Sequence, residues 1–207
     1  MHAIDDYLSQ LKAILDQLDR ERIADLIAIL TVVRGTGNHV FFMGNGGSGS
    51  TASHFATDLG KGTAVHGKKH FKVMPLNDHL PTFSAYANDV GYDSVFAEQL
   101  RAFVERGDVV IGLSASGNSA NVLRAMEVAL ESGAIRVGFT GYDGGKLRNN
   151  VDLNLHAPAH NVGRAEDAHH IMMHLICECI RSAAADQYAL PPWLAREDWG
   201  LRVKTRG

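Results

Sequence analysis

Five short runs of β-branched and aromatic residues recur along this chain, and each is followed by Gly, Ser, Asn or Asp. They are residues 39–43, 71–76, 109–113, 136–140 and 152–156. A stretch with helical periodicity comes after most of them, so strands and helices alternate. This alternation predicts an α/β fold with a doubly wound, parallel five-stranded sheet. Such sheets bind ligands outside the carboxyl ends of their strands, so we expect a site at that edge.

Two helical stretches precede the first strand. Apolar residues at steps of three and four run from Ile4 to Leu18 and again from Ile23 to Val33, with a charged break at 19–22 between them. The pattern predicts an antiparallel helical hairpin over residues 1–35. One hairpin cannot cover both its own apolar stripe and a sheet, so we expect it to serve in oligomerisation. Packing on its own domain is the alternative.

Length and composition indicate a single domain over residues 1–207, because 207 residues with 45% hydrophobic content suffice for one substantial core. The last helix is expected over about 164–184, followed by a tail, residues 186–207, that packs in extended form. Cys177 and Cys179 lie two apart in an apolar helical pattern. They point to different faces there, so they are interpreted as unpaired, buried thiols.

The charge balance excludes some classes of partner. A net charge of -3 argues against binding nucleic acid, which generally draws on clustered Lys and Arg. No apolar run approaches the roughly 20 residues of a membrane span, and the N-terminus lacks the basic-then-apolar layout of a signal peptide. We therefore expect a cytoplasmic protein with no membrane partner.

Two loops rich in Gly and Ser follow predicted strands, and each opens a helix. The first is Gly44-Asn45-Gly46-Gly47-Ser48-Gly49-Ser50, and the second is Ser114-Ala115-Ser116-Gly117-Asn118-Ser119. Small residues let backbone amides approach an anion, hydroxyls donate to it, and helix N-termini add unpaired N–H groups. Two such turns can converge on one phosphate. The bland alternative is that each loop only makes a tight turn and caps a helix.

The first loop also matches G-x-G-x-x-G, so dinucleotide binding has to be weighed, with Asp78 as a ribose partner. That motif is weak alone, and a dinucleotide fold would leave the second loop unexplained. No phosphate-binding loop with the lysine of nucleotide hydrolases is present in the sequence.

Carboxylates and histidines recur at helical spacing. His54 and Asp58 are four apart directly after the first loop, and Glu166, His170 and His174 repeat every four residues in the last helix. An imidazole and a carboxylate on each of two helices suit a zinc site or a proton-transfer pair. Surface carboxylates and helix-packing histidines are the bland alternative.

Together these motifs resemble the sedoheptulose 7-phosphate isomerases (phosphoheptose isomerases) of the sugar-isomerase, or SIS, domain family. The resemblance covers roughly residues 3–181 and rests on the two loops, His54-Phe55-Ala56, Ala87-Asn88-Asp89 and the turn at 141–145. It implies an SIS fold, a homotetramer and active sites between subunits. The residues it places around the phosphosugar are Asn45, Gly46, Gly47, Ser48, Asp89, Ser114, Ala115, Ser116, Ser119 and Glu166.

The resemblance also implies a reaction, in which a ketose phosphate and an aldose phosphate interconvert through an enediol. It places Asp58 as the base and His174 as the acid. Members that bind zinc hold it between residues matching His54, Asp58, Glu166 and His174, where the metal is structural, inhibitory or catalytic.

Three positions depart from the family pattern. The family usually has Glu at position 58 and Gln at position 166, and an arginine where this chain has Gly62 beside Lys61. Losing a methylene withdraws a base by roughly 1 Å, which can cost on the order of a hundredfold in rate. Either the pocket has compensated or the substrate differs. A noncatalytic SIS protein resembling the DnaA initiator-associating protein is the alternative function, although such a scaffold has no need of Asp58 together with His174.

Overall fold

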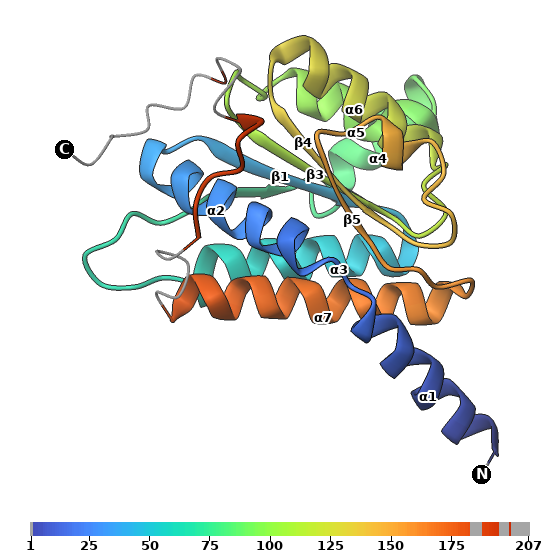
Figure 1. The fold of residues 1–207 in the computed structure, drawn as a ribbon. Helices are drawn as coiled ribbons and strands as arrows, with labels where there is room; N and C mark the ends of the chain where they lie inside the picture. Colours follow the sequence, from blue (N-terminus) through green and yellow to red (C-terminus); the bar gives the residue numbers. More distant parts are fainter. Residues whose placement is uncertain (1, 183–187, 195–198, 200–207) are drawn as a thin grey trace.

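A computed structural model describes residues 2–182, 188–194 and 199 (Figure 1). Its centre is a parallel sheet of five strands in the order β2-β1-β3-β4-β5. Their bounds are β1 His39–Gly44, β2 Lys72–Pro75, β3 Val109–Ser114, β4 Ile135–Thr140 and β5 Leu153–His156. The predicted fold class is confirmed, with all five strands at the predicted places.

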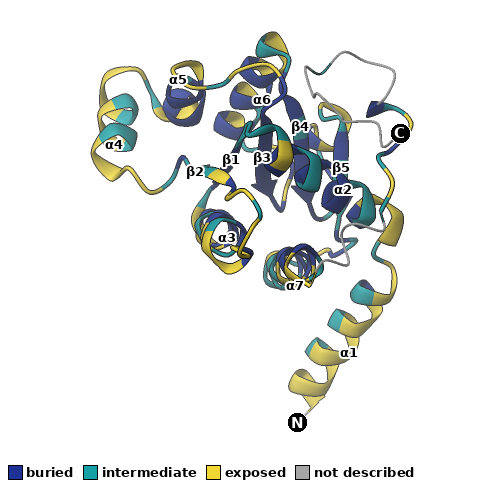
Figure 2. Cartoon of the chain, turned by 90° about the vertical axis from the view of Figure 1, so that its left-hand side faces the viewer, coloured by how far each residue is buried: buried dark blue, intermediate teal, exposed yellow. Residues whose placement is uncertain are grey.

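Helices cover both faces of the sheet (Figures 1 and 2). On one face lie α2 (Arg20–Thr36), α3 (Gly46–Thr57) and α7 (Val162–Arg181), which share a buried core with side chains such as Phe42 and Phe139. On the other lie α5 (Val95–Arg101) and α6 (Ala120–Ser132), which pack over Phe41 and Val110. Alternate side chains of one strand therefore enter different cores, as the pleat of a strand requires.

Shorter elements complete the chain. They are the π-helical turn η1 (Asp58–Gly62), the helix α4 (Leu80–Asp89) and the 3-10 turns η2 (Tyr92–Ser94) and η3 (Leu147–Asn149). No residue of α4 is buried, so this helix lies at the periphery of the fold (Figure 2). Among the described helices, none is both long and apolar enough to cross a membrane.

The two N-terminal helices form as predicted, but their antiparallel packing is wrong. α1 (His2–Asp16) projects from the body and contacts α7 with part of its length, whereas α2 packs on α7 and β5 (Figure 1). Asp19 caps α2 by accepting hydrogen bonds from the amides of Glu21 and Arg22. Only Ile14 of α1 is buried, and Ile4 and Leu8 of its predicted apolar stripe are exposed.

The C-terminal elements agree with the sequence where the structure describes them. α7 takes the place of the predicted last helix, and it carries a buried Cys177 and a half-buried Cys179, both unpaired. Trp193, Leu194 and Trp199 pack on the core that α2, α3 and α7 share with the sheet. The rest of the predicted tail, 186–187, 195–198 and 200–207, lies outside the described residues.

His169 ties α7 to the sheet and makes folding sensitive to acid. Its buried Nε2 lies 3.0 Å from the carbonyl oxygen of Thr140, to which it donates. Burial lowers the pKa of His169 to about 4, against an opposing contribution from this hydrogen bond. In unfolded chains the imidazole titrates near 6.5. Between these two values the unfolded state binds more protons, so stability falls as pH decreases.

We expect His169 to account for a loss of roughly 3 kcal/mol of unfolding free energy as pH falls from 7.5 to 4. The measurement is denaturant unfolding across this range for the wild type and His169→Gln, whose amide can donate to Thr140. The difference in unfolding free energy between the two proteins should shift by that amount across the range. Equal pH dependence in both proteins would contradict the assignment.

Candidate functional site at the carboxyl edge of the sheet

The two predicted loops meet at the carboxyl ends of β1 and β3. Both contribute to one cavity of about 290 Å³, to which Asn45 and Ser48 come from the first loop and three serines from the second. We call it the serine cavity; its full lining is Asn45, Ser48, Leu113, Ser114, Ala115, Ser116, Ser119, Tyr142, Val162 and Glu166. The Oγ atoms of Ser114 and Ser119 lie 3.0 Å apart. The loops therefore present several hydroxyls to one space, as a phosphate requires.

Amide side chains that the sequence analysis missed hold the first loop in place. Asn45 and Asn121 exchange two hydrogen bonds of 2.9 Å, which join the first loop to the start of α6. Asn77 accepts from the amide of Gly44 and donates to its carbonyl. Tyr92 donates to Asn45 Oδ1 at 2.9 Å. Spacing gave no signal for these contacts, because each joins residues at least 33 positions apart in sequence.

A turn after β4 supports the second loop. The amide of Gly141 donates to the carbonyl of Ala115, and that of Leu147 to the carbonyl of Gly117. The Tyr142 backbone has a φ of 48°, the one positive value among described residues other than glycine. Tyr142 also lines the serine cavity; its turn, 141–145, carries part of the resemblance, but no site role was predicted for Tyr142.

Asp58 and His174 line a second cavity, of about 500 Å³, between η1 and the later turns of α7. Lys61, Gly62, Cys177, Glu178 and Arg181 complete its lining. Asp58 Oδ2 lies 3.5 Å from His174 Nε2 and 3.4 Å from His54 Nε2. The predicted base and acid are therefore adjacent. π-helical turns are rare and frequent at functional sites, and here one begins at Asp58.

The two cavities both border α7, because Glu166 lines one and His174 lines the other. Glu166 lines the serine cavity, and its carboxylate rests so close to Gly47 that any side chain there would collide with it. His174 lines the second cavity, two turns further on. Eight residues of helix advance about 12 Å. The hydroxyl-lined cavity and the carboxylate–imidazole pair therefore border α7 about 12 Å apart, and no described residue lines both cavities.

Three imidazoles gather between α3 and α7. The ligand-capable atoms of His54, His170 and His174 all lie within 4.8 Å of one another. His170 thus joins two of the predicted metal ligands, while Glu166 lies at the serine cavity. Burial, followed by the neighbouring His174 and His54, lowers the pKa of His170. Burial raises the pKa of Cys177 to about 12, so its thiol stays protonated and inert.

Two aspartates stand away from this site. Asp89, which the resemblance places near the sugar, ends α4 and accepts from Asn88 Nδ2 at 2.7 Å. It lines neither cavity of the site. Asp78, the ribose partner of the dinucleotide alternative, accepts a hydrogen bond from Ser53 Oγ.

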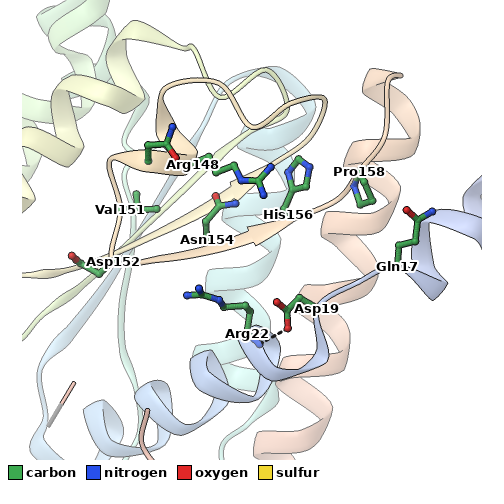
Figure 3. Close-up of a pocket in the computed structure, with 10 residues that line it drawn as sticks. Gln17, Asp19, Arg22, Arg148, Val151, Asp152, Asn154, His156 and Pro158 are labelled. Carbon is green, nitrogen blue, oxygen red and sulfur yellow. Dashed lines mark hydrogen bonds between the residues drawn. The ribbon is translucent and has the colours of Figure 1, made fainter. Parts of the chain in front are cut away.

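A further cavity, of about 520 Å³, lies beyond the edge strand β5 and shares no residue with the site (Figure 3). Both of its carboxylates are engaged. Asp152 accepts from Arg136, and Asp19 caps α2. The cavity therefore offers the imidazole of His156 beside its arginines but no free carboxylate to pair with it, unlike the Asp58–His174 site.

Fold and site together define an α/β sugar-phosphate-binding domain, and residues 6–141 match a family model described as the SIS domain. The chain belongs to the phosphoheptose isomerase family of SIS-domain proteins. It is 36% identical over 183 residues to the phosphoheptose isomerase of Geobacter sulfurreducens, covering 86% of this chain and 96% of that one. It is 41% identical to the phosphoheptose isomerase of Helicobacter pylori (strain HPAG1), over 68% of this chain and 73% of the relative.

Solved structures agree with this assignment. The phosphoheptose isomerase of Neisseria gonorrhoeae superposes with a TM-score of 0.80 at 29% identity, over 87% of this chain and 96% of that one. The phosphoheptose isomerase of Francisella tularensis also superposes with a TM-score of 0.80, at 26% identity, over 87% of this chain and 97% of that one.

Proposed function

We propose that this protein is a cytoplasmic phosphosugar isomerase that interconverts sedoheptulose 7-phosphate, or a similar ketose phosphate, and the corresponding aldose phosphate. The observation that carries the proposal is the separation of the hydroxyl donors from the Asp58–His174 pair, which lies about 12 Å further along α7. A seven-carbon sugar has its phosphate at one end and its reacting carbons at the other. A long substrate therefore suits this separation better than a three-carbon one.

The serine cavity would hold the phosphate. Hydroxyls of Ser48, Ser114, Ser116 and Ser119 donate to it, and the N-terminus of α3, which carries Gly46 and Gly47, adds backbone amides and a partial positive charge. Asn45 and Glu166 border the same cavity and would contact sugar hydroxyls. Anchoring the phosphate places the open-chain sugar along α7 with its carbonyl end toward Asp58.

Two pairs of proton transfers then complete the isomerisation, one pair forming the enediol and the other consuming it. The Asp58 carboxylate removes a proton from C1 of the ketose, which gives the enediol, and returns it to C2. The His174 imidazole donates a proton to the carbonyl oxygen and accepts one from the neighbouring hydroxyl. The 3.5 Å between Asp58 and His174 lets the two groups serve adjacent carbons. This pair also gives no support to a noncatalytic scaffold.

Zinc is the proposed cofactor, because imidazole and carboxylate, the donors gathered around Asp58, are ligands that zinc prefers. When bound there, zinc would take the lone pairs that Asp58 and His174 use in proton transfer, and it would polarise a substrate oxygen as a Lewis acid in place of that pair. His54 and His174 would hold it together with Asp58.

The test of the function is conversion of sedoheptulose 7-phosphate by the purified protein, followed by chromatographic separation of ketose and aldose phosphates. We expect turnover and saturation. A protein that binds the phosphosugar but converts none of it would refute catalysis and leave only binding.

We also propose a homotetramer with sites between subunits, to which Asp89 of α4 would contribute in a neighbouring copy. Ile4 and Leu8 on the projecting α1 and Ile171 and Leu175 on α7 are exposed apolar side chains that such an assembly would bury. Light scattering should give a mass of four chains, and a monomer at micromolar concentration would exclude the assembly.

A further inference from the structure

We infer that the divalent cation site of this chain consists of three imidazoles and one carboxylate, from His54, Asp58, His170 and His174. His170 takes the position that the resemblance gives to Glu166. The inference rests on the proposed zinc cofactor and specifies its ligands. His54 comes from α3, Asp58 from η1, and His170 and His174 from α7, so the site would join three elements. The three imidazoles form one cluster, and Asp58 contacts two of them.

The spacing around Asp58 fits ligands of one ion. Two ligand atoms that are each 2.0–2.1 Å from the same tetrahedral zinc lie about 3.3 Å apart. Asp58 Oδ2 is 3.4 Å from His54 Nε2 and 3.5 Å from His174 Nε2. These distances exceed the usual range of an N–H···O hydrogen bond. The carboxylate is therefore placed as a shared ligand would be, with an imidazole nitrogen on each side.

His170 completes the set. Its ligand-capable nitrogen lies within 4.8 Å of those of His54 and His174, so a movement of about 1–1.5 Å would bring all three to tetrahedral spacing. His170 Nδ1 lies 3.5 Å from the hydroxyl of the buried Thr51, so Nε2 is the ring nitrogen that would bind the ion. Metal-bound histidines usually engage their other ring nitrogen in this way, which fixes the ring orientation.

Glu166 is placed for a different task. It lies one turn before His170 and two turns, about 12 Å, before His174. Its carboxylate rests against Gly47 in the first loop, and Glu166 lines the serine cavity, which Asp58 does not line. His170 lies between the two cavities, one turn from His174, and so meets His54 and His174 without leaving its helix face.

Edge-to-face packing of the three rings is the competing explanation. Their centroids lie 4.8–5.1 Å apart, which is also a normal distance for stacked aromatic side chains. Packing alone accounts for the rings but not for the carboxylate between two of them. Ring packing alone also predicts no affinity for a cation, so a binding measurement distinguishes it from a metal site.

The test is titration of chelator-treated protein with Co²⁺, followed by visible absorption, and competition with Zn²⁺. We expect one equivalent per chain and a spectrum of four-coordinate cobalt. Losing an outer-shell partner of a ligand already weakens metal affinity about 10–100-fold, so His170→Gln should weaken Zn²⁺ binding at least tenfold. Glu166→Gln is the matched control, since it removes a charge on the same helix, and its affinity should stay near that of the wild type.

Equal affinity of His170→Gln and wild type, a loss in Glu166→Gln as large as in His170→Gln, or no binding at all would overturn the inference. X-ray absorption at the zinc edge of the wild-type protein gives a second readout, which does not depend on a variant folding. Three imidazole ligands are expected, and two would contradict it. Isomerase activity of the chelator-treated protein is measured separately, so a failed metal site leaves the proposed function standing or falling on its own assay.

Discussion

Replacing Asp58 by Asn is expected to lower the kcat for phosphosugar isomerisation by about 10²–10⁴-fold, the usual contribution of a positioned general base. The amide keeps the size of the side chain but accepts no proton from carbon. KM should change little, because the phosphate is anchored in the serine cavity, which Asp58 does not line. The measurement is steady-state kinetics with sedoheptulose 7-phosphate for both proteins after treatment with a chelator.

Asp58→Glu is the matched control, because it keeps the carboxylate and supplies the methylene that the family usually has. It should retain far more activity than Asp58→Asn. The ratio of the two rates measures how well this pocket is adapted to the shorter side chain. An Asp58→Asn enzyme that keeps more than about a tenth of its kcat would show that another group is the base. A raised KM with unchanged kcat would assign Asp58 to binding.

The sheet was predictable because its signals are local. The three central strands β1, β3 and β4 are short, mostly apolar runs that are buried on both faces, and parallel order follows from the helices between the strands. The end of α6 was equally local. Gly133 adopts a φ of 73° and ends the helix as a left-handed glycine cap.

The arrangement of the site depended on packing that a linear pattern does not contain. Helical spacing put Glu166, His170 and His174 on one face, but which of them meets His54 depends on how α3 crosses α7. Likewise, apolar periodicity predicted α1 without saying where it points. The Asn45–Asn121 pair joins residues 76 positions apart, so no local signal announces it. Local sequence patterns therefore predicted the fold, whereas the arrangement of the site residues depends on how the helices pack.

Substituting Gly117 by Ala is expected to reduce the unfolding free energy by about 2–5 kcal/mol and to weaken phosphosugar binding. Gly117 has a φ of 63°, where an L-residue costs about 1–2 kcal/mol. A Cβ there would also overlap the carbonyl oxygen of Gly144, which is backbone and cannot turn aside. Overpacking of this kind typically costs a further 1–3 kcal/mol.

The clash would weaken phosphosugar binding because it separates the second loop from the turn after β4. Moving Gly117 from Gly144 breaks the hydrogen bonds that hold the second loop on the turn after β4, so the serines lose their common orientation. Gly67→Ala is the control, because Gly67 has a φ of 81° but nothing within 4 Å of a Cβ. It should show only the backbone cost, with phosphosugar binding unchanged. Equal effects of the two substitutions on denaturant unfolding and on binding would mean that the contact between these turns does not shape the phosphate site.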